Sequence, residues 1–402
     1  MTVLPPGPAV MLRYGEVFLK SDPVRREFIK TLVRNCREAL RSEGLFSTER
    51  ITRGRIFFYG EPTGKVAEVL SRIFGVADVA ECTLTPPDPD AVTEAAVARA
   101  RASARLRTTF AVRARREGDF GMTSQELAAR VGSAVLAACP GITVDLDNPD
   151  YELHVELRHT GGVVYDRRIP APGGLPLGTQ GSVLALLSPG IDSPVAAWLM
   201  MKRGCGILSL HVSHGKEEGS STVAGTLRNL SILSEWCRGF PIRLFVVDAG
   251  PFYERVAGLR NPRFACVLCK RFMLRVGSLL ARREGIAALC TGDSLGQVAS
   301  QTLVNMVVIS NAAEVPVFRP LIAFDKQEIV TLAREIGTFD ERPGDLSCPF
   351  VPKVPATTSR EEEIRTLEAM LEIDALLPGI LDNAHEYVAC NGEVTRRVPQ
   401  PG

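Results

Sequence analysis

Residues 183–203 read VLALLSPGIDSPVAAWLMMKR, and this stretch decides the fold of the second half of the chain. An apolar run is followed at once by a short loop of small residues and then by apolar residues at helical spacing, which predicts a strand, a tight loop and a helix. We expect Ser193 to cap the helix, because serine is a good N-cap and Pro194 is tolerated in a first helical turn. The loop would then face the positive end of the helix, where a phosphate group binds well.

The residues after this stretch alternate between strand-like and helix-like patterns, which predicts a parallel sheet covered by helices, with ligands at the carboxyl ends of the strands. A last amphipathic helix is expected at residues 361–377, and the final twenty or so residues carry no strong pattern. Upstream, the Pro/Gly-rich residues 170–178 mark the clearest domain boundary, and two smaller α+β units precede it. We therefore predict domains at residues 1–62, 63–169 and 170–402.

Composition and charge narrow the class of protein. The 402 residues, 45% hydrophobic and 23% charged, are typical of a globular chain with more than one core. A net charge of +1 excludes neither an acidic nor a basic partner, because local patches decide binding. No apolar run reaches the roughly 18 residues of a membrane span, and the first residues do not resemble a signal peptide. We expect a cytoplasmic protein without a membrane partner.

The ten cysteines, without a secretion signal, argue against a disulfide framework and for buried thiols, catalysis or metal binding. Most are isolated and are expected to be small buried hydrophobes. Cys266 and Cys269 differ, because they form CVLC and are followed by Lys270 and Arg271, whose charges favour thiolates. The pair alone is compatible with a redox disulfide, half of a zinc site or part of an iron–sulfur cluster.

Residues 99–116 carry a cluster of arginines without an acidic residue. Such a cluster neutralises nucleic-acid phosphates, although a solvated protein surface explains it about as well. Because aromatic residues are sparse there, recognition of an RNA backbone and its shape fits better than stacking on bases. The cluster consists of Arg99, Arg101, Arg105, Arg107, Arg113, Arg115 and Arg116.

The loop at residues 188–193 resembles the PP-loop, SGGxDS, of ATP pyrophosphatases, which adenylate a substrate and release pyrophosphate. An ordinary strand-to-helix turn is the alternative. Pro189 stands where the PP-loop usually has glycine, and it removes one N–H donor. The resemblance implies that the loop binds the pyrophosphate part of ATP, with Mg²⁺, through Ser188, Gly190, Asp192 and Ser193.

Two later stretches extend the resemblance to one family. Residues 291–302, TGDSLGQVASQT, and residues 319–329, RPLIAFDKQEI, are similar to segments of the tRNA 4-thiouridine synthetase (ThiI) family. Upstream, LRYGEVFLK resembles that family's N-terminal ferredoxin-like domain, while FAVRARREG and VDLDNPDYELHVEL resemble its THUMP domain. Too few residues follow Cys348 for a rhodanese-like domain, so we expect the form of the family that lacks one.

The family resemblance implies an α/β fold class. A C-terminal PP-loop ATP pyrophosphatase domain with a Rossmann-like parallel sheet would follow an α+β ferredoxin-like domain and a THUMP domain that binds tRNA. Gly292, Gln297 and Gln301 are expected to help bind ATP. Lys326 would stabilise charge on the transferring phosphoryl group, after Asp325 as helix cap. The THUMP resemblance makes three arginines the first candidates for tRNA phosphate contacts: Arg113, Arg115 and Arg116.

Cys348 lies in DLSCPFVPKVPAT, which resembles the family segment with the sulfur-handling cysteine. Together, Cys266, Cys269 and Cys348 would hold three irons of a four-iron cluster and leave the fourth open for sulfide. Two alternatives stay open, a zinc site completed by Cys348 or Cys290 and a persulfide on Cys348 alone. We assign no role to the histidines, His211 and His214 included.

The implied function is that of a tRNA uridine 4-sulfurtransferase. ATP would adenylate the 4-oxygen of uridine 8, and a sulfur nucleophile would then attack C4 and expel AMP. Cys348, Asp192 and Lys326 are the predicted catalytic residues. The implied partners are tRNA, a sulfur donor (sulfide or a cysteine desulfurase) and a second copy of the chain in a homodimer.

Two other functions stay open at this point. Part of the family also supports delivery of sulfur for the thiazole of thiamine. A protein that binds tRNA without catalysis, its PP-loop disabled by Pro189, is the alternative outside enzymes. Pyrophosphate release that depends on tRNA would distinguish an enzyme from such a binding protein.

Overall fold

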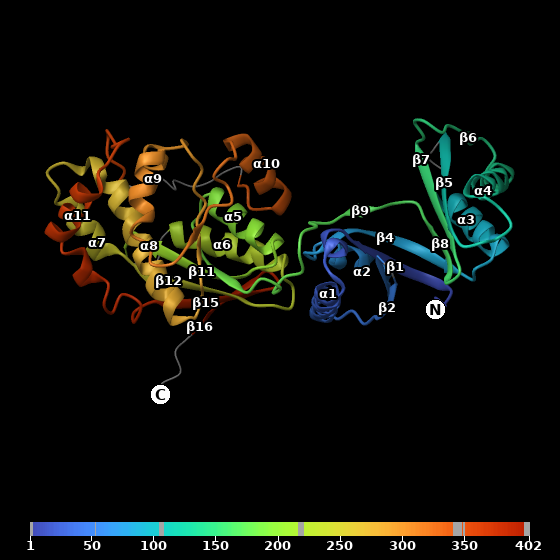
Figure 1. The fold of residues 1–402 in the computed structure, drawn as a ribbon, viewed down its shortest axis with the longest axis horizontal. Coiled ribbons are helices and arrows are strands. Elements are labelled where there is room, and N and C mark those ends of the chain that lie inside the picture. The colour runs from blue at the N-terminus through green and yellow to red at the C-terminus, as the bar shows by residue number, and fades with distance from the viewer. Residues whose placement is uncertain are drawn as a thin grey trace. The chain divides into compact units, whose positions relative to one another are not determined.

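The computed structural model describes residues 3–52, 54–103, 108–215, 221–340, 348 and 350–397. The chain divides into two compact units, Met1–Gly174 and Leu175–Gly402, which we call the N-terminal unit and the C-terminal unit (Figure 1). Among the described helices, none combines the length and apolar character that a bilayer crossing requires.

One continuous sheet runs through the N-terminal unit, in the order β2-β3-β1-β4-β8-β7-β5-β6, with β9 on β4. Strand β4 pairs with β1 on one side and with β8 and β9 on the other, so it joins the two α+β units that the sequence suggests. The strands are β1 (Gly7–Tyr14), β2 (Thr48–Thr52), β3 (Arg55–Tyr59), β4 (Val76–Thr85), β5 (Thr109–Glu117), β6 (Thr143–Val144), β7 (Tyr151–Arg158), β8 (Gly161–Tyr165) and β9 (Ile169–Pro170).

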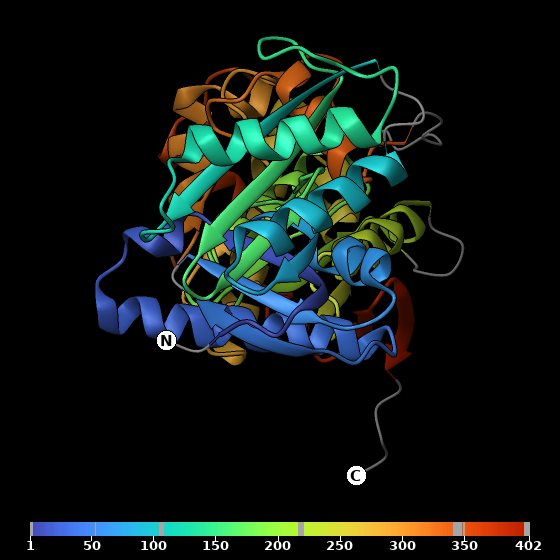
Figure 2. The ribbon, with the colours of Figure 1, turned by 90° about the vertical axis from the view of Figure 1, so that its right-hand side faces the viewer.

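Two pairs of helices cover this sheet. Helices α1 and α2 pack on β1 and β3, where alternate residues such as Val10 and Leu12 face them. Helices α3 and α4 lie side by side and pack on β5 and β7 (Figure 2). The helices are α1 (Asp22–Ser42), α2 (Thr63–Leu70), α3 (Pro89–Ser103) and α4 (Ser124–Ala138), with a 3₁₀ turn at Glu16–Leu19.

A buried ion pair links distant strands of the same sheet. Arg55 on β3 and Glu156 on β7 are 6% and 2% exposed, and Nη2 of Arg55 lies 2.7 Å from Oε1 of Glu156. Burial opposes ionisation of Glu156, but the Arg55 guanidinium holds the pKa of this carboxyl below its ordinary value. The pair therefore binds the two halves of the N-terminal unit together.

The C-terminal unit has a seven-stranded sheet in the order β14-β13-β10-β11-β12-β15-β16. Strands β10 to β14 pair in parallel, which confirms the predicted α/β class. The strands are β10 (Ser182–Leu186), β11 (Gly206–Ser213), β12 (Ile242–Asp248), β13 (Leu289–Cys290), β14 (Val317–Phe318), β15 (His385–Cys390) and β16 (Glu393–Arg397). The helices are α5 (Asp192–Lys202), α6 (Ser221–Glu235), α7 (Gly250–Ala257), α8 (Ala265–Arg283), α9 (Leu303–Ser310), α10 (Lys326–Ile336) and α11 (Glu361–Met370), with 3₁₀ turns at Pro262–Phe264, Ala299–Gln301 and Ile373–Leu376.

The C-terminal end of the chain departs from the sequence expectation in two places. The predicted helix at residues 361–377 is wrong beyond Met370, because Glu372 has φ +46° and this left-handed backbone separates α11 from a 3₁₀ turn. The last described residues, 385–397, form the hairpin β15–β16, which we did not predict. Its turn contains Asn391 and Gly392, with φ +53° and +88°, the dipeptide that favours a two-residue hairpin turn.

Candidate functional site

The loop between β10 and α5 is held by its own serines. The Oγ of Ser193 accepts a hydrogen bond from the backbone N–H of Ser188 at 2.9 Å and lies 2.9 Å from the Ser188 hydroxyl. The prediction that Ser193 caps the helix was wrong: α5 begins at Asp192 after Ile191, and Ser193 lies inside its first turn. Its side chain folds back across the loop instead, so it fixes the loop's curvature.

Pro189 fits a space that helix α6 leaves for it. A Cβ on Gly225 of α6 would lie 2.6 Å from Cβ of Pro189, so the proline ring packs on bare helix backbone. One turn further, the side-chain N–H group of Asn229 donates to the carbonyls of Ser188 (3.0 Å) and Gly190 (3.4 Å). The loop is therefore shaped by α6 as well as by its own residues, and Pro189 removes one amide donor without removing that support.

A second loop, residues 291–302, approaches the first one closely. A Cβ on Gly292 would lie 2.7 Å from the carbonyl carbon of Asp192 and 2.7 Å from the nitrogen of Ser193, so only glycine fits. The side-chain amide of Gln297 donates to Oδ2 of Asp192 at 3.2 Å. On the other side, Nζ of Lys326 lies 2.8 Å from Oδ1 of Asp192. Four residues selected from separate sequence stretches thus meet at the start of α5.

Gln301 belongs to a neighbouring polar cluster around Asp293. Its amide donates to Oδ1 of Asp293 at 3.1 Å, and Nζ of Lys270 lies 2.5 Å from the same oxygen. The Thr291 hydroxyl donates to Oδ2 at 2.7 Å. Burial opposes ionisation of Asp293, but Lys270 and these hydrogen bonds hold the pKa of the carboxyl well below its ordinary value. The sequence pointed to Lys270 only as a neighbour of the cysteines and did not point to Asp293, because their pairing across 23 residues is visible only in the fold.

A cavity of about 300 Å³ opens beside the PP-loop-like segment, at the carboxyl ends of β10 and β11. His211 projects from β11 and is 4% exposed, with Nδ1 3.0 Å from the carbonyl oxygen of Leu187. Since a carbonyl only accepts, Nδ1 carries the proton and Nε2 keeps a lone pair. Burial lowers the pKa of His211 to about 4, so the ring is neutral near pH 7. The cavity is also lined by Ser188, Pro189, Gly190, His214, Thr222 and Met273.

The three predicted metal-binding cysteines share one region of the C-terminal unit. Cys266 and Cys269 lie in the first two turns of α8. Burial, then the charge of Cys348, raises the pKa of Cys266, and burial raises the pKa of Cys269 to about 12, with smaller contributions from the other two thiols. In the part of the chain that the structure describes, no three His, Cys, Asp or Glu side chains are arranged to hold one metal ion. Cys290 lies apart in β13, where burial raises the pKa of its thiol to about 12, with smaller contributions from Cys205 and Asp293 and none from these three.

Aromatic side chains connect the cysteines with the cavity. His214 lines the cavity, and its ring meets the ring of Tyr253 edge-on, with centroids 4.8 Å apart. The hydroxyl of Tyr253 lies 3.0 Å from Sγ of Cys269. The cavity beside the loop and the thiols are therefore neighbours through His214 and Tyr253.

The arginine cluster is only partly gathered in the N-terminal unit. Arg113 and Arg115 of β5 line a hollow of about 540 Å³ with Arg168, at the N-terminal end of α4. Arg116 bonds the carbonyl of Gly118 and is not among the residues that line this hollow. Nε of Arg113 lies 2.8 Å from Glu152, and Arg115 is exposed. Of the other cluster members, Arg105 and Arg107 lie outside the described residues.

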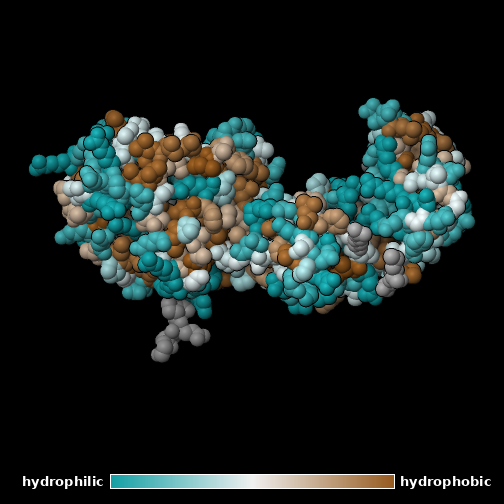
Figure 3. All heavy atoms as spheres, in the orientation of Figure 1, coloured by the Kyte–Doolittle hydropathy of each residue, from teal (hydrophilic) through white to brown (hydrophobic). Residues whose placement is uncertain are grey.

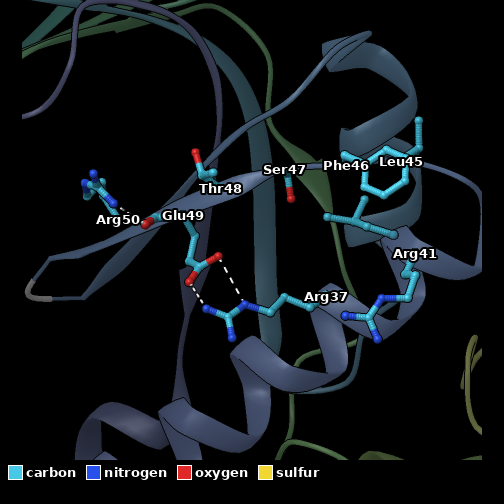
Figure 4. A pocket seen from close by; sticks show the side chains of 9 residues that line it. Arg37, Arg41, Leu45, Phe46, Ser47, Thr48, Glu49 and Arg50 are labelled. Carbon is cyan, nitrogen blue, oxygen red and sulfur yellow. Dashed lines mark hydrogen bonds and ion pairs between the residues drawn. The ribbon is translucent and has the colours of Figure 1, made fainter.

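A second hollow of the N-terminal unit lies between α1 and β2 (Figure 4). It measures about 490 Å³ and contains Phe46, which is 84% exposed and lies near Arg41 in Figure 4. Two of its arginines have acidic partners, since Nε of Arg37 donates to Glu49 at 3.2 Å and Nη1 of Arg41 lies 3.0 Å from Glu38, whereas Arg50 donates to a backbone carbonyl. In both hollows, therefore, some arginines already have a carboxylate partner, as Arg113 has in Glu152 beside α4.

Exposed apolar side chains gather on the C-terminal unit near the second loop. Leu303, Val304 and Val307 of α9 are 68%, 48% and 55% exposed, and Leu295 and Val298 of the preceding loop are about half exposed. Figure 3 shows hydrophobic atoms on the face where Figure 1 places α9. Patches of this kind mark surfaces that bind other macromolecules.

Three models of known families match the chain. The model "Thiamine biosynthesis protein (ThiI)" matches residues 178–373, "ThiI ferredoxin-like domain" matches residues 9–80, and "THUMP domain" matches residues 88–165. Together they cover most of the chain in the order expected from the sequence. The chain belongs to the ThiI family.

Individual relatives agree with membership of the ThiI family. A protein of Methanothermobacter thermautotrophicus named "Probable tRNA sulfurtransferase" is 38% identical over 361 residues, 88% of this chain and 91% of that protein. A "tRNA sulfurtransferase" of Pyrobaculum aerophilum is 37% identical, over 90% of this chain and 74% of that protein. A solved structure, "Crystal structure of a 4-thiouridine synthetase - RNA complex with bound ATP", is 30% identical with a TM-score of 0.85, covering 95% of this chain and all of its own. The predicted family is confirmed.

Proposed function

We propose that this chain is an ATP-dependent tRNA sulfurtransferase that makes 4-thiouridine at uridine 8 of tRNA. Membership of the ThiI family makes the chain an enzyme, as predicted. One observation carries the proposal further: the PP-loop cavity and the three cysteines adjoin through His214 and Tyr253. A site that activates a base with ATP and a site that supplies sulfur must lie this close, because both act on one carbon atom of the base.

ATP is proposed to bind at the start of α5. The first-turn amides of α5 and the hydroxyls of Ser188 and Ser193 face the phosphates, while the lone pair on Nε2 of His211 suits a donor group of the nucleoside. Asp192 is the ligand that suits Mg²⁺, since its carboxylate lies at the loop and hard cations prefer oxygen. Lys326, already 2.8 Å from that carboxylate, supplies positive charge to the phosphoryl group that is transferred to the 4-oxygen of uridine.

The sulfur step is proposed to use Cys266, Cys269 and Cys348. A donor set of three thiols in one region suits iron–sulfur ligation, and the charge of Lys270 partly opposes the burial that raises the pKa of Cys266 and Cys269. A cluster held by these residues would leave one iron free to bind the incoming sulfide. Tyr253 and Phe350, whose rings stack beside the thiols, are proposed to keep water from the activated base. Free sulfide or a cysteine desulfurase is the proposed donor.

The tRNA is proposed to bind through the hollow beside α4. Arg115 and Arg168 border it together with Ser124 and Gln125, the first residues of a helix whose backbone N–H groups attract phosphate. Arg113 lines the same hollow, and Arg116 is proposed to add charge at its edge only. A tRNA substrate implies that the enzyme works in the cytoplasm.

A homodimer is proposed on the evidence of the exposed apolar side chains on α9. The loop at residues 291–302, which precedes α9, carries both Gln297 and Gln301 and the exposed Leu295 and Val298. A partner bound to this surface would therefore border the active site. Sedimentation of the wild type and of Val307→Lys tests this: the variant is expected to be monomeric at concentrations where the wild type is a dimer. A monomeric wild type contradicts the proposal.

The deciding experiment is nucleoside analysis of tRNA after an anaerobic reaction with ATP and sulfide. The wild type is expected to produce 4-thiouridine, AMP and pyrophosphate. Cys348→Ala is expected to produce no 4-thiouridine. Lack of tRNA-dependent pyrophosphate release by the wild type would refute the proposed enzyme and favour a protein that only binds tRNA.

A second role in thiamine biosynthesis is suggested by the description of the matching family model. The same thiols would pass sulfur to the thiazole precursor instead of to tRNA. Growth of a thiamine-requiring host separates the two roles. Asp192→Asn is expected to lose activity on tRNA. If this variant still restores growth, transfer of sulfur to the thiazole does not need adenylation at this site.

A further inference from the structure

Tyr253 lies where the segments that carry the cysteines meet. Its hydroxyl is 3.0 Å from Sγ of Cys269. Its ring stacks on Phe350, with the ring centroids 4.5 Å apart and the planes inclined by 24°. Since Phe350 follows Cys348 by two residues, one tyrosine on α7 contacts both the CVLC helix and the segment of the third cysteine.

The surroundings of Tyr253 leave its side chain little freedom. The residue is 2% exposed, with the ring of Phe252 edge-on at 5.2 Å and the ring of His214 edge-on at 4.8 Å. A buried hydroxyl requires a hydrogen-bond partner, and the sulfur of Cys269 is in place to be that partner. When this sulfur is a thiolate or a metal ligand it has no proton, so the hydroxyl must donate.

We propose that Tyr253 is a positioning residue for the three cysteines. Its hydroxyl orients the sulfur of Cys269, and its ring holds the segment of Cys348 against α7. Hydrogen bonds to ligand sulfurs and the surrounding apolar shell are known to set the properties of sulfur-ligated metal centres. The inference rests on the proposed use of these three thiols in sulfur transfer, and it assigns separate tasks to the two parts of one side chain.

The task of the ring is tested in the full-length, metal-free protein. Mild oxidation with diamide, followed by peptide mass spectrometry, measures how fast Cys348 forms a disulfide with Cys266 or Cys269. Tyr253→Phe keeps the ring and is expected to stay within about twofold of the wild type, whereas Tyr253→Leu is expected to slow cross-linking at least tenfold, because the stacking surface for Phe350 is lost. Equal rates in both variants, or no cross-link in the wild type, would overturn the proposal.

The task of the hydroxyl is tested after anaerobic reconstitution with iron and sulfide. At equal iron content, Tyr253→Phe is expected to have a more negative midpoint potential than the wild type, because the lost hydrogen bond had stabilised the extra electron density on sulfur. Tyr387→Phe on β15, which removes a hydroxyl elsewhere in the same unit, is the control and should leave the potential unchanged. An unchanged potential in Tyr253→Phe overturns the role of the hydroxyl.

The cross-linking and potential measurements together distinguish a failure of this inference from a failure of the proposed function. If no variant and no wild-type protein binds iron, the cluster in the proposed function is wrong, and the cross-linking rates still decide whether Tyr253 positions the thiols. If the wild type binds iron and makes 4-thiouridine while both Tyr253 variants match it in potential and cross-linking rate, the function stands and the role of Tyr253 is refuted.

Discussion

The loop between β10 and α5 in the C-terminal unit and the arginine-lined hollow of the N-terminal unit differ in how many of their polar groups other elements hold. At the loop, Asp192 is held by Gln297 and Lys326, and the loop carbonyls by Asn229. In the hollow, Arg113 is paired with Glu152. On β5, the Arg115 side chain is exposed to solvent. From this difference we expect ATP chemistry to depend on geometry that one substitution can destroy, and RNA binding to be a sum of screened charges.

Among the changes predicted below, replacing Asp192 with Asn is expected to have the largest effect on activity. The amide cannot hold Mg²⁺ as a carboxylate does and leaves Lys326 without its charge partner. Pyrophosphate release that depends on tRNA is expected to fall on the order of 100- to 1000-fold. The matched control is Asp325→Asn, since asparagine caps a helix as well as aspartate does, and it should retain activity. Equal rates in both variants would mean that Asp192 is not part of the machinery.

Acid is expected to weaken the C-terminal unit through His211. The folded pKa of about 4 lies below the ordinary value of 6.5, so the folded state binds fewer protons than the unfolded state between these values. Stability is therefore full above pH 6.5 and falls as the pH drops toward 4, by up to about 3 kcal/mol. Unfolding free energies of the wild type and His211→Gln should converge as the pH is lowered from 7.5 to 5. A difference that stays constant over this range contradicts a neutral, buried imidazole.

Gly292→Ala tests how tightly the two loops of the C-terminal unit must approach. The added Cβ would lie 2.7 Å from backbone atoms of Asp192 and Ser193, so the loops must separate. We expect a loss of about 1–3 kcal/mol in unfolding free energy, with weaker ATP binding in calorimetry. Gly132→Ala in helix α4, where the nearest atom is 4.0 Å away, is the control and should be neutral or stabilising. Unchanged ATP affinity in Gly292→Ala would refute the close packing.

The smallest effects are expected for single arginines of the N-terminal unit. Arg115→Ala and Arg168→Ala should each weaken tRNA binding by roughly tenfold and lower the slope of log affinity against log salt by about 1. Arg116→Ala should change both quantities less, because Arg116 does not line the hollow. Filter binding at several salt concentrations gives the three slopes. If Arg116→Ala has the largest effect, the RNA follows the other face of β5.

The sequence was most informative where a motif lies within one continuous stretch. The loop before α5, the capping box that begins at Asp325 and the parallel α/β architecture all follow from local patterns and are present in the structure. That Arg116 does not line the hollow with Arg113 and Arg115 was not anticipated from the sequence, and the contact of all three with tRNA phosphates stays a prediction. The hairpin was missed although the Asn391–Gly392 dipeptide is a strong turn signal.

Other features could not be read from the sequence, because they depend on which elements meet. Gly225 and Pro189 are 36 residues apart, and only the packing of α6 on the loop shows that one makes room for the other. The same holds for His211, whose neutral state depends on burial beside the carbonyl of Leu187. A histidine at a strand end has no sequence signal that distinguishes this environment from solvent.

The shared sheet of the N-terminal unit limits where the chain can be cut into fragments that fold. Residues 9–80 and 88–165 match two separate family models, yet β4 forms ladders with strands on both sides, and the Arg55–Glu156 pair spans them. A fragment that ends between the two matches would expose the edge of the sheet at β4. It would also leave the buried Arg55 without Glu156, and an unpaired buried charge costs about 3–5 kcal/mol of stability. These two segments are therefore expected to be inherited, exchanged and engineered as one piece, because both halves need β4 as a partner strand.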